Sequence, residues 1–309
     1  MPTFDPDRIR RALSRRGIVP AVAVSDAASG RANDAVIRPA ELVEDAVLRA
    51  HAVGAPEPWT EPVAFLDGTQ RTTVVGYAAT SPIVVAVVAA AVRQRRDRRL
   101  ATVVVERRTI AVGRAAALEA AGDALDGFDR CPIPNADAGH PVRELAAASR
   151  IVDRARGGLE VMAGLAYRER DPGWLVVDGS LSESPAWAAD PMMVGVAKSH
   201  ATLPFDGEAL ECYLRLPFGH RSSIFAPASR SVAPVRSWAL RLWPWEGKDI
   251  FHGLVRVETS PANAVPGLAD LLSRRLLAER APISTPDPRW DRLLYGIHSV
   301  EQYLRATPA

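Results

Sequence analysis

The spacing of apolar residues changes from helical to extended near residue 60. Residues 5–16 and 37–53 carry apolar positions at helical spacing, and Pro39 stands near the start of the second segment. These patterns predict two helices. They would form an N-terminal helical extension over residues 1–58.

Apolar runs typical of strands follow this extension. They read "VAFLDG" at 63–68, "RTTVVGYAAT" at 71–80, "PIVVAVVAAAV" at 82–92 and "LATVVVERR" at 100–108. Short polar connections between such runs predict an antiparallel meander. Asp67-Gly68 ends the first run. Asp-Gly is a favoured hairpin pair, so a turn at this point is one interpretation of it.

The middle of the chain alternates between helix and strand. Residues 113–121 and 142–169 have helical patterns, and Gly157-Gly158 weakens the second one at its centre. The run "WLVVDG" at 174–179 is almost continuously apolar, as expected of a central strand. A further strand is predicted at 192–200.

The last third combines further strands with two closing helices. Strands are predicted at 209–216, 222–227, 235–245 and 251–259, and helices at 265–280 and 287–305. Asp287 would be the N-cap of the last helix and Pro288 its first residue. We therefore expect an α/β fold with a mixed sheet flanked by helices, and a β-rich C-terminal part. A single domain would span residues 1–309, with its core at 59–305.

Composition narrows the class of protein only slightly. The chain has 309 residues, a net charge of +2 and a pI near 8.7, which neither requires nor excludes nucleic acid. Its two cysteines form no CxxC pair, which argues against a disulfide framework or a cysteine zinc site and favours a cytoplasmic protein. The longest apolar run is about half of a membrane span, so no membrane association is expected.

Three acidic residues stand in an informative order. Asp67 and Asp178 each end an apolar strand, and Glu160 lies beside the apolar stripe of the helix between them, with Asp153 as the reserve candidate. The order strand aspartate, helix glutamate, strand aspartate is that of the ribonuclease H-like fold. Such carboxylates suit Mg²⁺ or Mn²⁺, and two ions about 4 Å apart can clamp the oxygens of a phosphodiester.

Several motifs together resemble the NurA nuclease family, whose core is ribonuclease H-like. They are "FLDGT", "WLVVDGSL", "VGVAKSH", the strand "GLVRVET" and a closing helix that contains a histidine. The resemblance spans roughly residues 60–305. It implies that Asp67, Glu160, Asp178 and His298 are catalytic metal ligands, and that Lys198 neutralises phosphate charge.

One position departs from the family pattern. Where the family has Tyr-Pro before the histidine, this chain has Arg289-Trp290-Asp291. Trp290, or Tyr295 one turn away, would have to take the place of the family tyrosine.

The resemblance implies a metal-dependent DNA nuclease with two Mn²⁺ or Mg²⁺ ions, acting in DNA end processing or defence. It also implies a homodimer that works with a HerA-type hexameric ATPase. Two alternatives remain open. One is a degraded module that binds DNA or the ATPase without cutting. The other is an ordinary α/β enzyme whose Asp-Gly pairs are turns, although the sequence contains no G-x-G-x-x-G or Walker motif.

Each candidate residue also has an ordinary structural interpretation. Glu160 could simply pair with Arg156 at i−4, His298 could be structural, and Lys198 could be a surface lysine. The basic runs at 93–99 and 274–280 could be solvated, or they could line a phosphate-binding groove.

Overall fold

The computed structural model describes residues 5–18, 36–137, 139–228, 233–246, 248, 250–282, 287 and 289–307. The α-helices in these ranges are α1 (Pro6–Ser14), α2 (Ala115–Ala121), α3 (Pro141–Arg168), α4 (Pro185–Ala189), α5 (Gly207–Leu214), α6 (Pro266–Ala278) and α7 (Tyr295–Ala306). Short 3₁₀ turns are η2 (Gly122–Leu125), η3 (Asn135–Asp137), η4 (Leu181–Glu183), η5 (Pro261–Asn263) and η6 (Trp290–Arg292).

The strands are β1 (Val36–Ile37), β2 (Glu41–Leu42), β3 (Ala50–Ala52), β4 (Val63–Ala78), β5 (Ser81–Arg96), β6 (Arg99–Gly113), β7 (Asp129–Pro132), β8 (Trp174–Asp178), β9 (Met193–Ala197), β10 (Thr202–Leu203), β11 (His220–Ser222), β12 (Phe225–Ala226), β13 (Arg236–Arg241) and β14 (Leu254–Thr259).

Twelve strands of the described chain form one mixed sheet. Its order is β2-β12-β13-β14-β9-β8-β4-β5-β6-β7, with β11 joined to β13 and β3 joined to β11. Strands β4, β5 and β6 form an antiparallel meander, whereas β8 pairs in parallel with both β4 and β9. The order β6-β5-β4-β8-β9 is that of the ribonuclease H-like core, which confirms the expected fold class. Strands β12 to β14 extend it as the expected β-rich C-terminal part.

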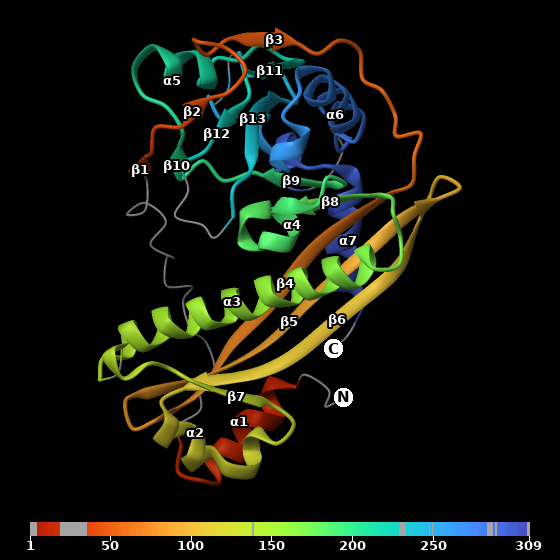
Figure 1. Cartoon of the computed structure of the whole chain (residues 1–309). Coiled ribbons are helices and arrows are strands. Elements are labelled where there is room, and N and C mark those ends of the chain that lie inside the picture. Colours follow the sequence, from red (N-terminus) through yellow and green to blue (C-terminus); the bar gives the residue numbers. More distant parts are fainter. Residues whose placement is uncertain are drawn as a thin grey trace.

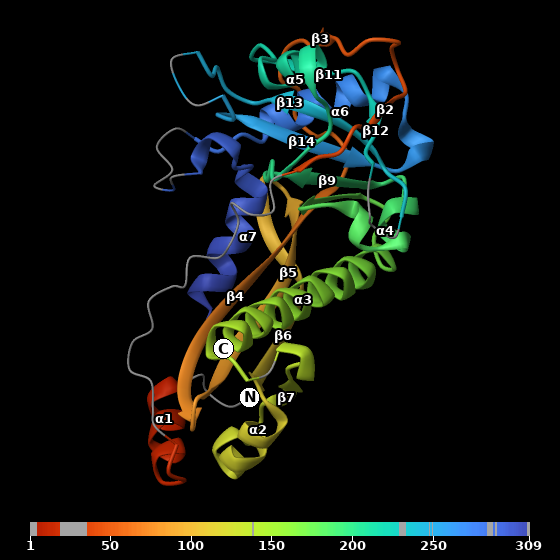
Figure 2. The ribbon, with the colours of Figure 1, turned by 90° about the vertical axis from the view of Figure 1, so that its left-hand side faces the viewer.

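Helices cover both faces of the central strands. Figure 1 shows α3 crossing one face of β4, β5 and β6, and Figure 2 shows α7 on the opposite face, with the sheet between them. The two faces correspond to two apolar cores. Ala64 and Leu66 of β4 pack in the α3 core, and Phe65 packs in the core that includes α6 and α7. This alternation along β4 decides which face each later residue of the strand presents.

The interpretation of Asp67-Gly68 as a hairpin turn is wrong. Strand β4 runs without interruption through both residues, and Asp67 and Gly68 pair with Ala91 and Ala90 of β5. The two segments predicted at 63–68 and 71–80 are therefore one strand. The turns of the meander lie elsewhere, at Ala79 and at Asp97-Arg98, whose φ angles are positive. A long ladder of pairing with β5 outweighs the local preference of Asp-Gly for turns.

The helix predicted at 37–53 is also wrong, and with it the helical character of much of the 1–58 extension. The segment forms the short strands β2 and β3, which pair with β12 and β11. Its alanine, leucine and glutamate residues favour a helix only weakly, so pairing with distant strands overrides that preference. The first predicted helix, α1, is present.

Two further predictions in the last third need correction. Residues 209–216 were expected to be a strand but lie largely in α5, whose Tyr213 is buried on one side of the helix. The closing helix begins at Tyr295 and not near residue 288, because Leu294 forms a β-bridge with Arg280 before it. Asp287 does not cap it, and Pro288 lies outside the described residues.

The cysteines and the helix lengths were the subject of two further predictions. Cys131 and Cys212 are both free thiols. The membrane-span criteria of length and apolarity are met by none of the helices in the described ranges.

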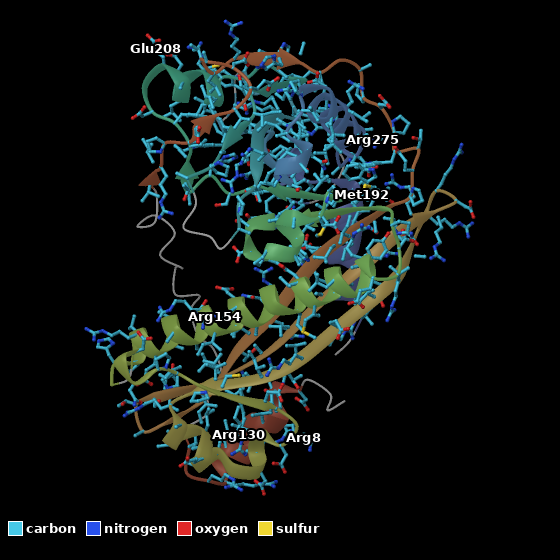
Figure 3. The ribbon with its side chains drawn as sticks, viewed as in Figure 1. Arg8, Arg130, Arg154, Met192, Glu208 and Arg275 are labelled. Atoms are coloured by element: carbon cyan, nitrogen blue, oxygen red, sulfur yellow. The ribbon has the colours of Figure 1, made fainter. Side chains whose placement is uncertain are left out.

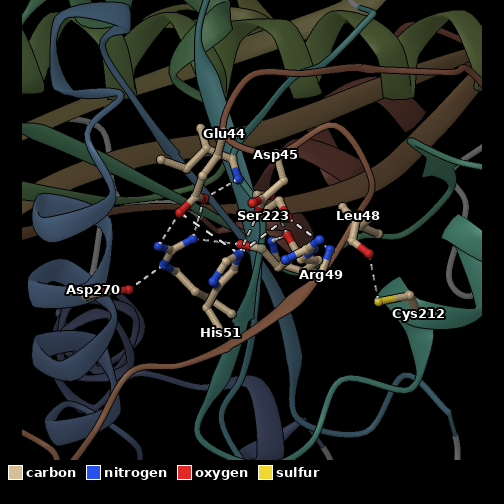
Figure 4. A network of polar contacts seen from close by, with 12 residues as sticks. Glu44, Asp45, Leu48, Arg49, His51, Cys212, Ser223 and Asp270 are labelled. Carbon is tan, nitrogen blue, oxygen red and sulfur yellow. Dashed lines mark hydrogen bonds and ion pairs between the residues drawn. The ribbon is translucent and has the colours of Figure 1, made fainter.

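A buried ion-pair network holds the segment before β4 against the C-terminal strands. Arg221 of β11, 1% exposed, donates from Nη1 and Nη2 to the two oxygens of Glu44 at 2.7 and 2.8 Å, and from Nε to Asp270 at 2.5 Å. Asp45 accepts a hydrogen bond of 2.7 Å from Ser223 and lies 2.8 Å from His51 (Figure 4). This network explains why the segment 41–52 adopts an extended structure rather than a helix.

We expect Glu44→Gln to lower the free energy of unfolding by about 3 kcal/mol or more, because it removes the bidentate partner of a buried guanidinium. Burial alone would raise the pKa of Glu44, but the hydrogen bond and charge of Arg221 hold that pKa below its ordinary value. The contribution of Glu44 to the free energy of unfolding is therefore present above the pKa that Glu44 has in the unfolded state, and it is lost as the pH falls.

Thermal unfolding of wild type and Glu44→Gln over a pH series measures this effect. The difference in Tm should be largest near neutral pH and shrink in acid. Glu41→Gln, an exposed residue of the same segment, is the control. An equal loss in both variants would contradict the role of the network.

Candidate functional site

Three of the residues proposed from the sequence lie on or next to adjacent parallel strands: Asp67 inside β4, Asp178 at the end of β8 and Lys198 just after β9. Strands β4 and β8 are in parallel register with Leu66 opposite Val177, so Asp67 and Asp178 follow next along the two strands. Asp178 pairs with Val196 of β9, and Lys198 comes directly after that strand ends. The parallel direction of β4, β8 and β9 therefore brings Asp67, Asp178 and Lys198 to one region of the sheet.

The two aspartates face the same side of the sheet. Phe65 of β4 and Val176 of β8 both pack in the core that contains α6 and α7. Asp67 and Asp178 lie two residues further on and so continue on that face. The alternation of side chains along a strand thus sets the face on which both aspartates lie. The parallel register places them at the same height along the two neighbouring strands.

Glu160 approaches the site from α3, on the opposite face, and reaches the strand only because residue 68 is glycine. A Cβ at Gly68 would collide with the Glu160 carboxylate. Glu160 is 8% exposed, at the edge of the α3 core. The helix carboxylate therefore lies against β4 at Gly68, the residue after Asp67.

Asp67 is a buried carboxylate without an ion-pair partner among the described residues. It is 7% exposed, and its Oδ1 accepts a 2.7 Å hydrogen bond from the backbone N–H of Gly68. Burial and the negative charge of Asp178 raise the pKa of Asp67 well above its ordinary value. Glu160 and Glu301 act in the same direction and Lys198 opposes them. The site therefore holds an excess of negative charge around Asp67.

The other two carboxylates each have a cationic partner. Lys198 Nζ lies 2.8 Å from Asp178 Oδ2, and Arg156 pairs with Glu160 along α3, as the ordinary interpretation of Glu160 expected. Even so, burial raises the pKa of Glu160 to about 7, against the charge of Arg156. Asp67, Glu160 and Asp178 do not form a set of ligand atoms all within 4.8 Å of one another in the described chain.

The turn after Asp178 is held by a second layer of contacts. The carbonyl of Gly179 lies 2.8 Å from the position that a Cβ on Gly195 would take, so only glycine fits there. Next to Gly195 in register stands Glu258 of β14, which is 1% exposed. Its Oε2 accepts hydrogen bonds from Ser180 Oγ at 2.7 Å and from the N–H of Leu181 at 2.9 Å. These contacts fix the direction in which the chain leaves Asp178.

His298 belongs to a neighbouring group on and before α7. Ligand atoms of Asp287, His298 and Glu301 all lie within 4.8 Å of one another. Arg289 pairs with Asp287 at 2.9 Å and with Glu301 at 3.2 Å. The charge of Glu301 contributes to the raised pKa of Asp67, so this group borders the three carboxylates.

Sequence reasoning missed Glu301 and the role of Asp287. The spacing of His298 and Glu301, three residues apart on a helix, was a usable signal for the first of them. No local signal pointed to Asp287, which a turn brings beside α7.

The two candidates for the family tyrosine have different surroundings. Trp290 packs edge-on against Trp243 and His252, with ring centroids 5.4 and 5.5 Å apart. Tyr295 is 52% exposed at the start of α7. Trp290 is therefore engaged in packing, whereas the Tyr295 ring is available to a ligand.

The donor atoms of the site suit a hard divalent cation. Asp67, Glu160 and Asp178 offer only carboxylate oxygens, which Mg²⁺ and Mn²⁺ prefer. A buried carboxylate is normally ion-paired or bound to a metal, and Asp67 has no ion pair in the described chain. By their chemistry these three residues suit such an ion. His298 and Glu301 lie beside them, and Arg289 donates to both Glu301 oxygens. The group Glu44, Asp45 and His51 is equally compact, but Arg221 occupies both Glu44 oxygens.

We expect Glu160→Gln to stabilise the metal-free protein above neutral pH. The pKa of Glu160 is about 7 in the folded protein and 4.5 in the reference state, so its stability contribution falls as the pH rises between these values. The variant removes the destabilisation that the ionised, buried Glu160 carboxylate causes, which is on the order of 1–3 kcal/mol.

Thermal unfolding in EDTA at about pH 8 and about pH 4 tests the sign. The variant should melt higher than wild type in the first buffer and equally in the second. Glu169→Gln, an exposed glutamate at the end of the same helix, is the control. A lower Tm for Glu160→Gln near pH 8 would show that the pair with Arg156 outweighs burial.

Comparisons with known proteins add the following. No family model matches the sequence. No curated protein matches it either. Among solved structures, the NurA nuclease from Sulfolobus solfataricus is similar at 10% identity and a TM-score of 0.49, over 81% of this chain and 80% of that chain. The catalytic domain of human Endonuclease V is similar at 16% identity and a TM-score of 0.31, over 79% of this chain and 81% of that chain. The first is from the family that the sequence motifs resemble. Because both TM-scores lie below 0.5, neither similarity establishes the function of this chain.

Proposed function

We propose that this chain is a metal-dependent nuclease that hydrolyses DNA phosphodiesters. The observation that carries the proposal is Asp67, a buried carboxylate with no ion pair among the described residues, beside Asp178 and Glu160. This arrangement suits the binding of two Mn²⁺ or Mg²⁺ ions. Such ions, when bound, stabilise the charge that develops on the phosphate during hydrolysis.

The chain's own residues would share the remaining work. Asp67, Glu160 and Asp178 would hold the ions. Lys198, 15% exposed at its side chain and 2.8 Å from Asp178, would orient that carboxylate and pair with a phosphate oxygen. His298 and Glu301 on α7 would close the site next to Asp67, and the exposed ring of Tyr295 would contact the substrate.

The proposed partners rest on the family resemblance of the sequence motifs. They are a second copy of the chain and a HerA-type hexameric ATPase that feeds DNA to the nuclease, in DNA end processing or defence. Light scattering of the purified protein should give the mass of a dimer, and co-purification with the ATPase should give a stable complex. If the protein is monomeric and does not bind the ATPase, neither partner can be part of the proposed function.

We expect the wild-type protein to degrade linear DNA with Mn²⁺ and to lose that activity in EDTA. Asp67→Asn and Asp178→Asn should each lower the rate about 100-fold or more, since even groups that merely orient metal ligands contribute about 10- to 100-fold. Asp206→Asn, an exposed aspartate before α5, should cut at the wild-type rate. Equal rates in wild type and both site variants would reject the site.

A second candidate function is a module that binds DNA or the ATPase without cutting. It is favoured by the ion pairs of Glu160 with Arg156 and of Asp178 with Lys198, and by the absence of a compact three-carboxylate group in the described chain. DNA binding without any cleavage in Mn²⁺, even with the ATPase present, would identify this function.

A further inference from the structure

The α7 group, formed by Asp287, His298 and Glu301, has the side chains of a metal site. One ligand atom of each residue lies within 4.8 Å of the others. Two carboxylates and an imidazole can together hold a divalent cation. The family resemblance of the sequence motifs also implies that His298 is a metal ligand. By composition alone, this group could therefore hold an ion of its own.

A guanidinium group already neutralises both carboxylates of the α7 group. Arg289 donates to Asp287 from Nε at 3.1 Å and from Nη2 at 2.9 Å. Its Nη2 also lies 3.2 Å from each carboxylate oxygen of Glu301. An arginine stays charged at every pH that proteins normally meet, so Arg289 is a permanent counter-ion that joins the turn before α7 to the helix itself.

The contrast between Glu301 and Asp67 shows where the chain lacks a cation. The two residues are almost equally buried, at 8% and 7% exposed. Glu301 pairs with both Arg289 and Arg305, whereas Asp67 has no ion pair in the described chain. A buried carboxylate needs such a partner or a metal, so a divalent ion would gain more at Asp67 than in the α7 group.

His298 directs an unused nitrogen into the α7 group. Its Nδ1 is shielded from solvent, has no hydrogen-bond partner among the described residues and lies 4.0 Å from Glu301. A guanidinium can only donate hydrogen bonds, whereas an imidazole nitrogen can bind a metal. Removing the charge of Arg289 should therefore leave a complete set of ligands for an ion.

The described chain contains a second group of the same composition, and an arginine fills that one as well. Ligand atoms of Glu44, Asp45 and His51 are equally close together, and Arg221 donates to both oxygens of Glu44. That group connects the segment before β4 to the C-terminal strands. In both groups, an internal guanidinium holds two segments together where an ion could do so.

Arginines of the two basic runs are used in a similar way. Arg95 pairs with Glu279 at 2.5 Å. Arg275, labelled on α6 in Figure 3, pairs with Glu61 at 2.6 Å, and its side chain is buried. Pairs of this kind account for part of the charge of the runs as structural, which weakens the interpretation of the runs as a phosphate groove.

We propose that Arg289 is the resident cation of the α7 group and takes the position that a metal ion would otherwise occupy there. It positions Glu301 and His298 on α7 whether or not metal is bound, and it confines metal ions to the three carboxylates of the proposed metal site. His298 is then no metal ligand, in contrast to what the family resemblance implies. This inference rests on the proposed function and concerns which residues hold its ions.

Electron paramagnetic resonance of Mn²⁺ with the full-length protein counts bound ions and tests the inference without a cleavage assay. Arg289→Met removes the charge and keeps an unbranched side chain, and it should bind about one Mn²⁺ per chain more than wild type. Arg289→Lys keeps a cation and should bind as many ions as wild type. Arg305→Met is the matched control and should also leave the count unchanged, because Arg305 pairs with Glu301 at 2.6 Å but has no ion pair with Asp287 in the described chain.

His298→Ala gives an independent measurement. In the wild-type background it should leave the number of bound Mn²⁺ ions unchanged, because no ion uses this imidazole. In the Arg289→Met background it should abolish the additional ion. The Tm of each variant in EDTA separates a lost ligand from a damaged fold.

The outcomes distinguish this inference from the function beneath it. Loss of an ion from wild type on His298→Ala overturns the inference, and so does a folded Arg289→Met protein that gains none. Both results leave the proposed nuclease intact if Asp67→Asn lowers the ion count. Wild type that binds no Mn²⁺ overturns the proposed function, and the ion that Arg289→Met gains or fails to gain then decides the inference by itself.

Discussion

The burial of the Asp67 carboxyl group is the constraint around which the site is organised. A carboxylate removed from water loses favourable solvation, and a protein normally compensates with an ion pair or a metal. Here the described chain offers one backbone hydrogen bond, while Asp178, Glu160 and Glu301 add negative charge nearby. The fold therefore stabilises an arrangement that a divalent cation would relieve.

Small residues make this concentration of charge possible. Gly68 leaves room for the Glu160 side chain to reach β4 from α3, and Gly195 leaves room for the turn that follows Asp178. Glu258 then holds that turn through Ser180 and Leu181. Two faces of one sheet can thus contribute carboxylates to a single region.

Helix α7 borders the site from the other side of the sheet. Helix α7 packs on β4, where Gly296 lies against the ring of Phe65. This contact places Glu301 near Asp67 and gathers His298 with Asp287. Far from the site, the pair of Arg221 and Glu44 holds the segment before β4 against the C-terminal strands. The segment that leads into the meander is therefore held in place.

Local patterns in the sequence were sufficient for the main order of the core. Long apolar runs and helical spacing predicted the meander, helix α3 and strands β8 and β9, because these elements bury wide faces and their periodicity is strong. The same order singled out Asp67, Glu160 and Asp178. These predictions required no knowledge of contacts between distant residues.

Tertiary structure alone decided what depends on pairing over long distances. Residues 41–52 have helix-forming composition, yet they are extended because β11, β12 and Arg221 provide partners from a region about 170 residues later. The continuity of β4 through Asp67-Gly68 likewise depends on its ladder with β5. The group of Asp287, His298 and Glu301 exists only once α7 and the turn before it are in place. Sequence periodicity reports which face a residue takes on its own element, whereas the packing of elements decides which charges meet.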